Sequence, residues 1–148
     1  MDRLIPPGVH GNNKKGGRPL AGPARARYPA LMSRKIIDVH THIFPDDLAA
    51  RAVKQLTGNS GETAFTDGTA GGLLDSMKRN GIAWSVTQPV STKGAQTPNV
   101  NTFAINLKRP GLINFGTLHP DYPDYAGEIR RLSAAGIKGV KFHPDYQK

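Results

Sequence analysis

Residues 35–43, with the sequence Lys-Ile-Ile-Asp-Val-His-Thr-His-Ile, decide the fold that we expect for this chain. The segment is β-branched and apolar at alternate positions, which is typical of a strand that is buried on one face. On such a strand Asp38, His40 and His42 share one face, opposite the apolar face of Ile37, Val39, Thr41 and Ile43. The apolar face suits a layer of helices, so we expect the polar face to point inside a sheet or barrel.

Helix-like and strand-like segments alternate through the rest of the chain. Helices are predicted over 46–56 (closed by Gly58), 73–80, 99–108 and 125–135, and further strands over 82–90, 112–120 and 137–144. Gly81 and the Pro110-Gly111 pair stand where helices should end. Because no hairpin signal is present, strands separated by helices must lie parallel. The predicted fold class is therefore α/β, with parallel βα repeats.

Four such repeats are half of what an eight-stranded TIM-like barrel, (β/α)8, requires, since that fold takes about 250 residues. We therefore expect residues 35–148 to form the N-terminal half of a truncated barrel. An open sheet of four strands is the alternative, although it would leave two parallel edges unprotected. A homodimer of half-barrels that closes the sheet is a third arrangement.

The first 34 residues have a different composition. Residues 1–31 carry five of the nine net positive charges of the chain and are rich in Pro, Gly and Asn. They lack a periodic apolar pattern, so residues 1–34 are predicted to be a disordered basic tail. A featureless extension upstream of Met32, a targeting sequence and a polyanion-binding segment are the alternative interpretations.

Composition excludes several classes of function. The 148 residues include no cysteine, which rules out disulfides, thiolate metal ligands and a cysteine nucleophile. No apolar stretch is long enough to span a membrane or to form a secretory signal, so we expect a cytoplasmic protein with no membrane partner. Because more than half of the excess positive charge lies in the tail, and the rest of the chain has no interleaved basic-aromatic pattern, nucleic acid is not expected as the partner. The site described below is expected to bind a small-molecule substrate.

Four of the five histidines fall on predicted strands. His42, His119 and His143 each lie at the C-terminal end of a strand, and His40 lies one pleat below His42. Loops converge at this end of parallel strands, and binding sites form there. The clustering therefore predicts a site at the C-terminal edge of the sheet.

His40 and His42 are predicted to be metal ligands. Two imidazoles on one strand face, about 6.6 Å apart along the strand, can tilt onto one ion, and imidazole nitrogen is a good ligand for Zn²⁺. Two core histidines bonded to backbone or to Asp38 are the alternative. His143, on the polar face of the fourth strand, is a candidate third ligand or a substrate contact.

Two further side chains are candidate substrate-binding residues. Lys141 lies one layer below His143 on the same face, and a structural cation or a carboxylated bridge between two metals are its alternative roles. His119 follows the third strand, where capping of the loop beside Pro120 is the alternative. Gln88, Ser91 and Thr92 follow the second strand and are expected near the pocket.

Four segments carry a resemblance to a known family, namely IIDVHTHIFP, LLDSMKRNGIAWSVTQPV, INFGTLHPDY and AAGIKGVKFHPDYQ. In this order and spacing they resemble the amidohydrolase superfamily, and within it the branch that includes aminocarboxymuconate semialdehyde decarboxylase. The resemblance covers about residues 35–147. It implies a (β/α)8 barrel with one divalent metal, commonly zinc with manganese as the alternative, held by His40 and His42. In the decarboxylase relatives a later histidine completes the shell, and Asp145 falls at that position here, two residues after His143.

The resemblance also implies an activity. Metal-activated water would hydrolyse C–N or C–O bonds, with metal-dependent decarboxylation as the sibling reaction. The family's general base lies on later strands, so the catalytic residues are not assigned, and these 148 residues alone are expected to be deficient in catalysis. A non-catalytic protein that binds polyanions through its basic tail is the alternative from another class.

Overall fold

The computed structural model describes residues 35–61 and 63–147. The chain divides into two units, Met1–Met32 and Ser33–Lys148, and the fold reported below is that of the second unit. The predicted basic tail over residues 1–34 lies outside the described residues.

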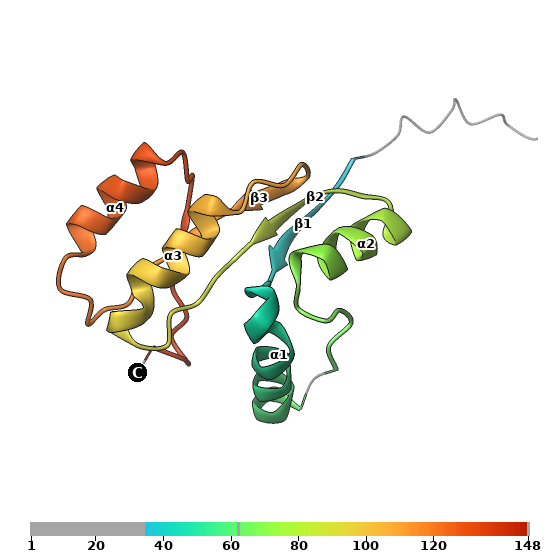
Figure 1. Ribbon diagram of the computed structural model, residues 1–148, viewed down its shortest axis with the longest axis horizontal. Coiled ribbons are helices and arrows are strands. Elements are labelled where there is room, and N and C mark those ends of the chain that lie inside the picture. Colours follow the sequence, from blue (N-terminus) through green and yellow to red (C-terminus); the bar gives the residue numbers. More distant parts are fainter. Residues whose placement is uncertain (1–34, 62, 148) are drawn as a thin grey trace, which may run out of the picture. The chain divides into compact units, whose positions relative to one another are not determined.

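Parallel strands alternate with helices along the described part of the chain (Figure 1). Strand β1 (Ile36–Thr41) is followed by helices α1 (Asp46–Ser60) and α2 (Ala70–Asn80) and by β2 (Ile82–Thr87). A short 3₁₀ helix, η1 (Gly94–Gln96), leads into α3 (Thr97–Asn106). The order then runs through β3 (Leu112–Asn114), β4 (Gly116–Thr117), α4 (Tyr125–Ala134) and β5 (Val140–Lys141). This order confirms the predicted α/β class with βα repeats.

Every strand pair in the described residues is parallel. β1 pairs with β2 and β2 with β3, while β4 pairs with β5. The predicted third strand is therefore two short strands that continue one another along residues 112–117. β3 bonds to β2 on one side, and β4 bonds to β5 on the other. Across the sheet the strand positions run β1, β2, β3/β4 and β5, which places the C-terminal ends of all the strands at one edge.

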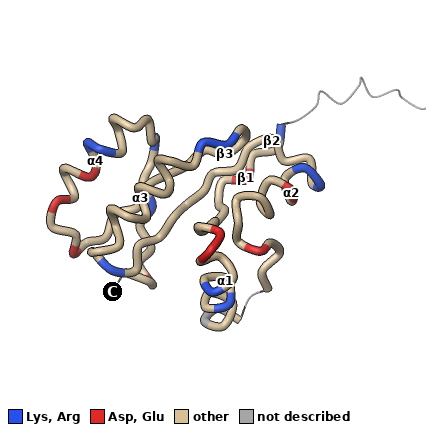
Figure 2. Tube along the Cα trace, viewed as in Figure 1, with Lys and Arg blue, Asp and Glu red and all other residues tan. Residues whose placement is uncertain are grey.

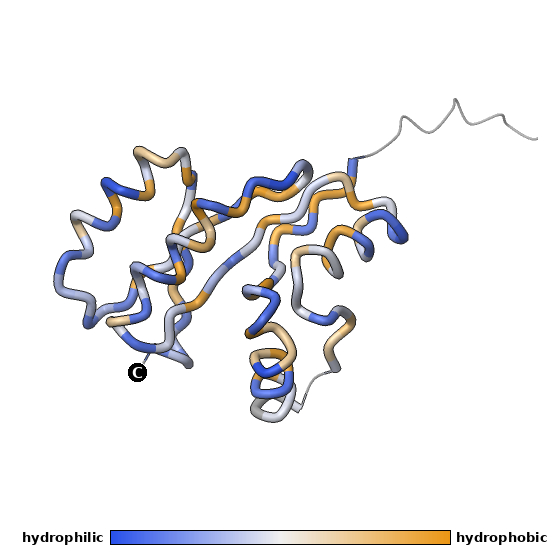
Figure 3. Tube along the Cα trace, in the orientation of Figure 1, coloured by the Kyte–Doolittle hydropathy of each residue, from blue (hydrophilic) through white to orange (hydrophobic). Residues whose placement is uncertain are grey.

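The apolar core lies on the helix-covered face of the sheet. Its main cluster joins Ile43, which follows β1, with buried side chains of α2 and with Leu112 of β3. Phe103 of α3 and the following Leu107 pack against the same cluster, so α2 and α3 cover the same face. Figure 3 shows the corresponding apolar segments along the strands. Burial of a large aliphatic side chain contributes about 1.5–3 kcal/mol, so this cluster holds α2 and α3 on the sheet.

The expectation that helices cover the whole apolar face of the first strand is wrong for its first half. Ile37 and Val39 are 52% and 63% exposed, whereas Thr41 and Ile43 are buried. The reason is that α2 packs against β2, while β1 pairs only with β2 among the described residues. The start of β1 is therefore an apolar edge.

Helix ends follow the predicted signals in part: α3 ends at Asn106, two residues before its predicted end, where Asn114 caps it. Gly81 adopts φ 67° and its N–H donates to the Met77 carbonyl, which ends α2 as predicted. The prediction that Gly58 closes the first helix is wrong, because α1 continues to Ser60 and Gly61 is its left-handed cap. The Thr57 hydroxyl donates to the Val53 and Lys54 carbonyls, 3.0 and 3.2 Å away, within this last turn.

No helix among the described residues has the length and apolar character that crossing a membrane requires.

Candidate metal centre

The two histidines of the first strand face each other at its C-terminal end. His40 lies in β1 and His42 follows the strand, and their Nε2 atoms are 3.1 Å apart. The ring centroids are 4.9 Å apart and the ring planes are inclined at 63°. The His40 backbone N–H donates to Asp38 Oδ1 at 3.1 Å. The alternation of the strand therefore brings the pair together, as the sequence predicts.

The separation of the two nitrogens fits a shared ion. Two imidazole nitrogens at 2.0–2.1 Å from one tetrahedral zinc are about 3.3 Å apart, close to the 3.1 Å between the two Nε2 atoms. In the metal-free protein the same approach requires one ring to donate a proton to the other. With an ion both rings would present a lone pair from Nε2.

The surroundings of His42 favour the neutral ring that a metal requires. Burial lowers the pKa of His42, and the neighbouring His40 ring lowers it further. Lys141 and His143 act in the same direction, while a hydrogen bond with the Gln88 backbone raises the pKa.

A cavity of about 360 Å³ joins the ends of β1, β2 and β5. His42 and His143 both line it, together with Val90 after β2 and Leu56 of α1. The other lining residues are mostly apolar, and the polar ones among them are Gln55, Thr92 and Tyr146. The predicted convergence of strand-end histidines is thus present for His42 and His143, which come from opposite edges of the sheet.

His143 lines the cavity but does not complete a metal shell. Its Nδ1 is buried without a hydrogen-bond partner, and its ring lies 4.5 Å from the Tyr146 ring. Across residues 35–61 and 63–147 no three His, Asp or Glu side chains lie close enough together to hold one ion. His40 and His42 therefore fit two positions of a divalent ion, and His143 stays a candidate for a third ligand or a substrate contact.

Lys141 and His119 occupy different environments. The half-buried Lys141 is close enough to His42 for its charge to lower the pKa of that ring, which places it beside the candidate centre. His119 is 4% exposed, and its Nδ1 accepts a hydrogen bond from the Asp121 N–H at 3.1 Å. Because that N–H opposes a proton on Nδ1, the 3.9 Å approach of Asp121 Oδ2 is not an ion pair. The capping alternative for His119 is the contact observed, and its Nε2 is buried without a partner.

The residues expected after the second strand divide into two groups. Thr92 lines the cavity, whereas Ser91 is fully buried and does not line it. The Gln88 side chain donates to the Val39 carbonyl at 2.6 Å and so ties β1 to the end of β2. Only Thr92 therefore has the position of a substrate contact.

Sequence reasoning missed Gln147, whose side chain bonds to three chain segments near the cavity. Its Nε2 donates to the carbonyls of Ser91 and Leu118, and its Oε1 accepts the His143 N–H at 2.8 Å. One side chain thereby links the segments that follow β2, β4 and β5. The only available signal was an amide residue close behind a strand-end histidine, which is too common to indicate a role.

A buried network of polar side chains around Asn101 was also missed. The Asn101 Nδ2 of α3 donates to the Thr117 carbonyl at 2.9 Å and to Glu128 Oε1 at 2.6 Å, and its Oδ1 accepts the Thr117 N–H at 2.7 Å. Glu128 of α4 also bonds to Arg131. The network fixes α3 and α4 to β4, whose end carries His119.

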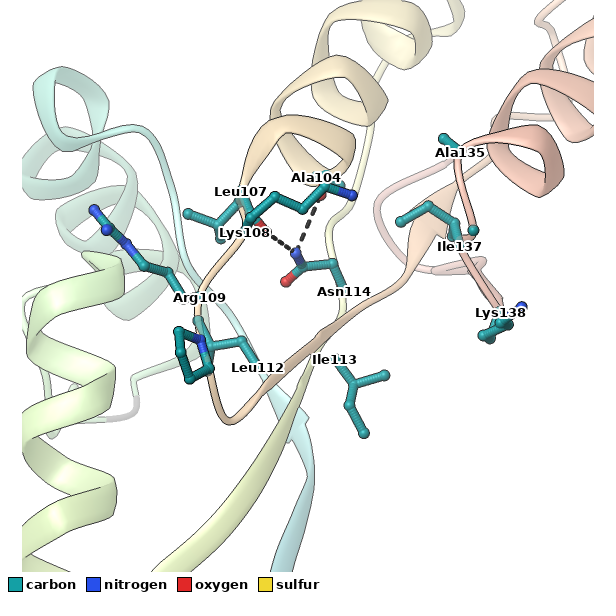
Figure 4. Close-up of a pocket in the computed structure, with 12 residues that line it drawn as sticks. Ala104, Leu107, Lys108, Arg109, Leu112, Ile113, Asn114, Ala135, Ile137 and Lys138 are labelled. Atoms are coloured by element: carbon teal, nitrogen blue, oxygen red, sulfur yellow. Dashed lines mark hydrogen bonds between the residues drawn. The ribbon is translucent and has the colours of Figure 1, made fainter.

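The described residues contain a larger hollow at the other end of the strands. It measures about 500 Å³ and lies beside the start of β3, with Lys108, Arg109 and Lys138 in its lining (Figure 4). Figure 2 shows the basic residues at the turn between α3 and β3. Inside the hollow Asn114 Nδ2 donates to the Ala104 and Leu107 carbonyls, so it caps the end of α3. No histidine or acid lines this hollow, and the strand-end histidines lie at the opposite edge.

Comparisons of the chain with protein-family models, with curated proteins and with solved structures gave no match. The resemblance to the amidohydrolase superfamily therefore depends on the sequence segments quoted above and enters below as part of a proposal.

Proposed function

We propose that this chain supplies the metal-binding first strand of a metal-dependent hydrolase of the amidohydrolase type. The observation that carries the proposal is the convergence of His40 Nε2 and His42 Nε2 to 3.1 Å at the C-terminal end of a parallel strand. A cavity of about 400 Å³ is lined by both histidines, and the cavity of about 360 Å³ is lined by His42 alone of the two, so a substrate would have access to the pair. A bound divalent ion, with zinc as the first choice, would lower the pKa of a water molecule and polarise a carbonyl group.

The residues of the chain would act around that centre. His40 and His42 would hold the ion in their neutral form, and the lowered pKa of His42 keeps that form available at neutral pH. Lys141 would offer a positive charge to a substrate carboxylate or a developing oxyanion. The apolar wall formed by Phe44, Leu56 and Val90 would exclude water from the rest of the substrate.

Titration of the purified, metal-free chain with Zn²⁺ and Mn²⁺ in a calorimeter tests the metal site. We expect saturable binding of one ion that is lost in the double variant His40→Ala, His42→Ala. His10→Ala is a matched control, because His10 lies in no strand motif, and it should bind as the wild type does. Equal binding by the double variant would contradict the proposal.

The same titration with His143→Ala decides the third ligand. A loss of more than about tenfold in affinity would assign His143 to the metal, since even outer partners of a metal site contribute 10–100-fold. Unchanged affinity would leave His143 as a cavity residue. Hydrolase and decarboxylase assays on the metal-loaded chain should both give little turnover, because the described residues provide no separate general base at the pair.

A further inference from the structure

The parallel ladder between β4 and β5 continues past both strands toward His143. The Gly116 N–H donates to the Gly139 carbonyl at 2.9 Å, and the Leu118 N–H donates to the Lys141 carbonyl at 3.4 Å. In a parallel ladder a residue bonds through its N–H to one residue of the partner strand, and through its carbonyl to the residue two positions further on. The regular continuation is therefore a bond from the His143 N–H to the Leu118 carbonyl.

The Gln147 amide stands between these two groups. Its Oε1 accepts the His143 N–H at 2.8 Å, and its Nε2 donates to the Leu118 carbonyl at 2.6 Å. Nε2 also donates to the Ser91 carbonyl at 3.0 Å, and a primary amide has the two N–H groups that these two carbonyls need. The half-buried Gln147 side chain thus replaces one bond of the ladder and keeps the two strand ends further apart than a direct bond would.

The His143 backbone is held from both sides by the same residue. Its carbonyl accepts the backbone N–H groups of Tyr146 and Gln147, both at 3.1 Å, while its N–H donates to the Gln147 side chain. The His143 ring lies 4.5 Å from the Tyr146 ring. The turn over residues 143–147, closed in both directions, therefore sets where these two rings lie.

The segments that Gln147 joins form two walls of the cavity of about 360 Å³. Val90 and Thr92, on either side of Ser91, line it from the segment after β2, and His143 and Tyr146 line it from the segment after β5. Since Gln147 bonds to the Ser91 carbonyl and to the His143 N–H, one amide spans both walls.

We propose that Gln147 is a positioning residue of the candidate site, which holds the His143 ring and the segment 90–92 at their separation across the cavity. The proposal rests on the proposed function only in treating this cavity as the place of the substrate, because none of the bonds that carry it involves a metal. Loss of the amide would leave two carbonyls and one N–H without these partners. The turn would then open, and the His143 ring would leave its place in the wall.

Modification of histidine rings by diethyl pyrocarbonate, followed peptide by peptide in the metal-free full chain, tests this position. Gln147→Met keeps the length of the side chain and removes its three polar bonds. We expect the His143 ring, whose Nδ1 is buried in the wild type, to react faster by about fivefold or more, the factor that corresponds to one hydrogen bond of ordinary strength. His40, on β1, should react at its wild-type rate. Gln55→Met, at an exposed position of α1 that also lines the cavity, is the matched control and should leave both rates unchanged.

Gln147→Glu provides a rescue that separates positioning from a general loss of stability. An ionised carboxylate cannot donate to the Leu118 carbonyl, whereas a protonated one can. The amide resonance of His119, which is joined to that carbonyl, should therefore differ from the wild type at about pH 7 and return toward it at about pH 5, because a carboxyl group that faces carbonyl oxygens has a raised pKa.

The outcomes decide the role of Gln147 whether or not the chain binds a metal. An unchanged His143 rate in Gln147→Met, an equal increase in Gln55→Met, or no return of the His119 resonance in acid would each overturn the proposal. An increase at His40 as large as that at His143 would also contradict it, because Gln147 would then support the whole fold and not the position of one wall. Absence of zinc binding alone, with these results as expected, would contradict the proposed function and leave the positioning role in place.

Discussion

Glu128 shows how one buried carboxylate depends on its partners. It is 4% exposed, and the hydrogen bonds from Arg131 lower its pKa below the ordinary 4.5, with the bond from Asn101 acting in the same direction and burial opposing both. The Arg131 side chain is 40% exposed, so water screens part of the interaction. The Glu128 carboxylate is therefore held in its charged form by its hydrogen bonds to Arg131 and Asn101.

The lowered pKa of Glu128 predicts a loss of stability in acid. As the pH falls below 4.5, the unfolded chain takes up the proton before the folded chain does, so the free energy of unfolding decreases until the lowered folded pKa is passed. Urea unfolding across this range should show a smaller decrease for Glu128→Gln than for the wild type. Asp75→Asn, in an exposed acid outside the network, is the control and should follow the wild type. Parallel curves for Glu128→Gln and the wild type would contradict this assignment.

At the scale of elements, α3 is attached to the sheet by Asn101. This side chain is fully buried and satisfies both the N–H and the carbonyl of Thr117. Truncation would leave a buried N–H and a buried carbonyl without partners, and each such group costs about 1–3 kcal/mol. The bond to Glu128 would be lost as well.

We therefore predict that Asn101→Ala lowers the free energy of unfolding by roughly 2–4 kcal/mol. Asn99→Ala, at an exposed position of the same helix, should change it by less than about 0.5 kcal/mol. Denaturant unfolding measures both, and the m value shows whether the transition stays cooperative. If the two variants were equally stable, Asn101 would have no structural role in joining α3 to β4.

The elements themselves could largely be predicted because their signals are local. Gly81 marks the end of α2 through backbone geometry alone. The extension of α1 past Gly58 could not be predicted, since nothing local favours Gly61 over Gly58 as the left-handed cap. The division of the third strand into β3 and β4 also depends on neighbours, because each part bonds to a different strand.

The candidate site shows the same division between local and long-range information. The pairing of His40 with His42 follows from strand alternation, because residues two positions apart lie on the same face of a strand. His42 and His143 line one cavity only because the whole sheet forms between them. The predicted parallel order of the strands indicated that both would lie at the C-terminal edge. The hydrogen bonds of Gln147 to three separate segments leave no trace in the sequence, because nothing local distinguishes this residue from an exposed glutamine.

At the scale of the whole molecule, stability should be greatest in the middle of the sheet and lowest at its two edges. Ser85 and Thr117 are fully buried, and their N–H groups bond to the Gly111 carbonyl at 2.9 Å and to Asn101 Oδ1 at 2.7 Å. The start of β1 and the end of β5 carry exposed side chains and one strand neighbour each. Amide groups that open only when the whole domain unfolds lie in such centres, and edges open locally.

Hydrogen exchange measured residue by residue should therefore rank the amides from the centre of the sheet outward. We expect the amides of Ser85, Phe115 and Thr117 to exchange slowest, at rates that report global unfolding, and those near Gly61 at the end of α1 to exchange fastest. Fast exchange at Ser85 and Thr117 would instead mean that the centre of the sheet opens locally and is not the most stable part of the described fold.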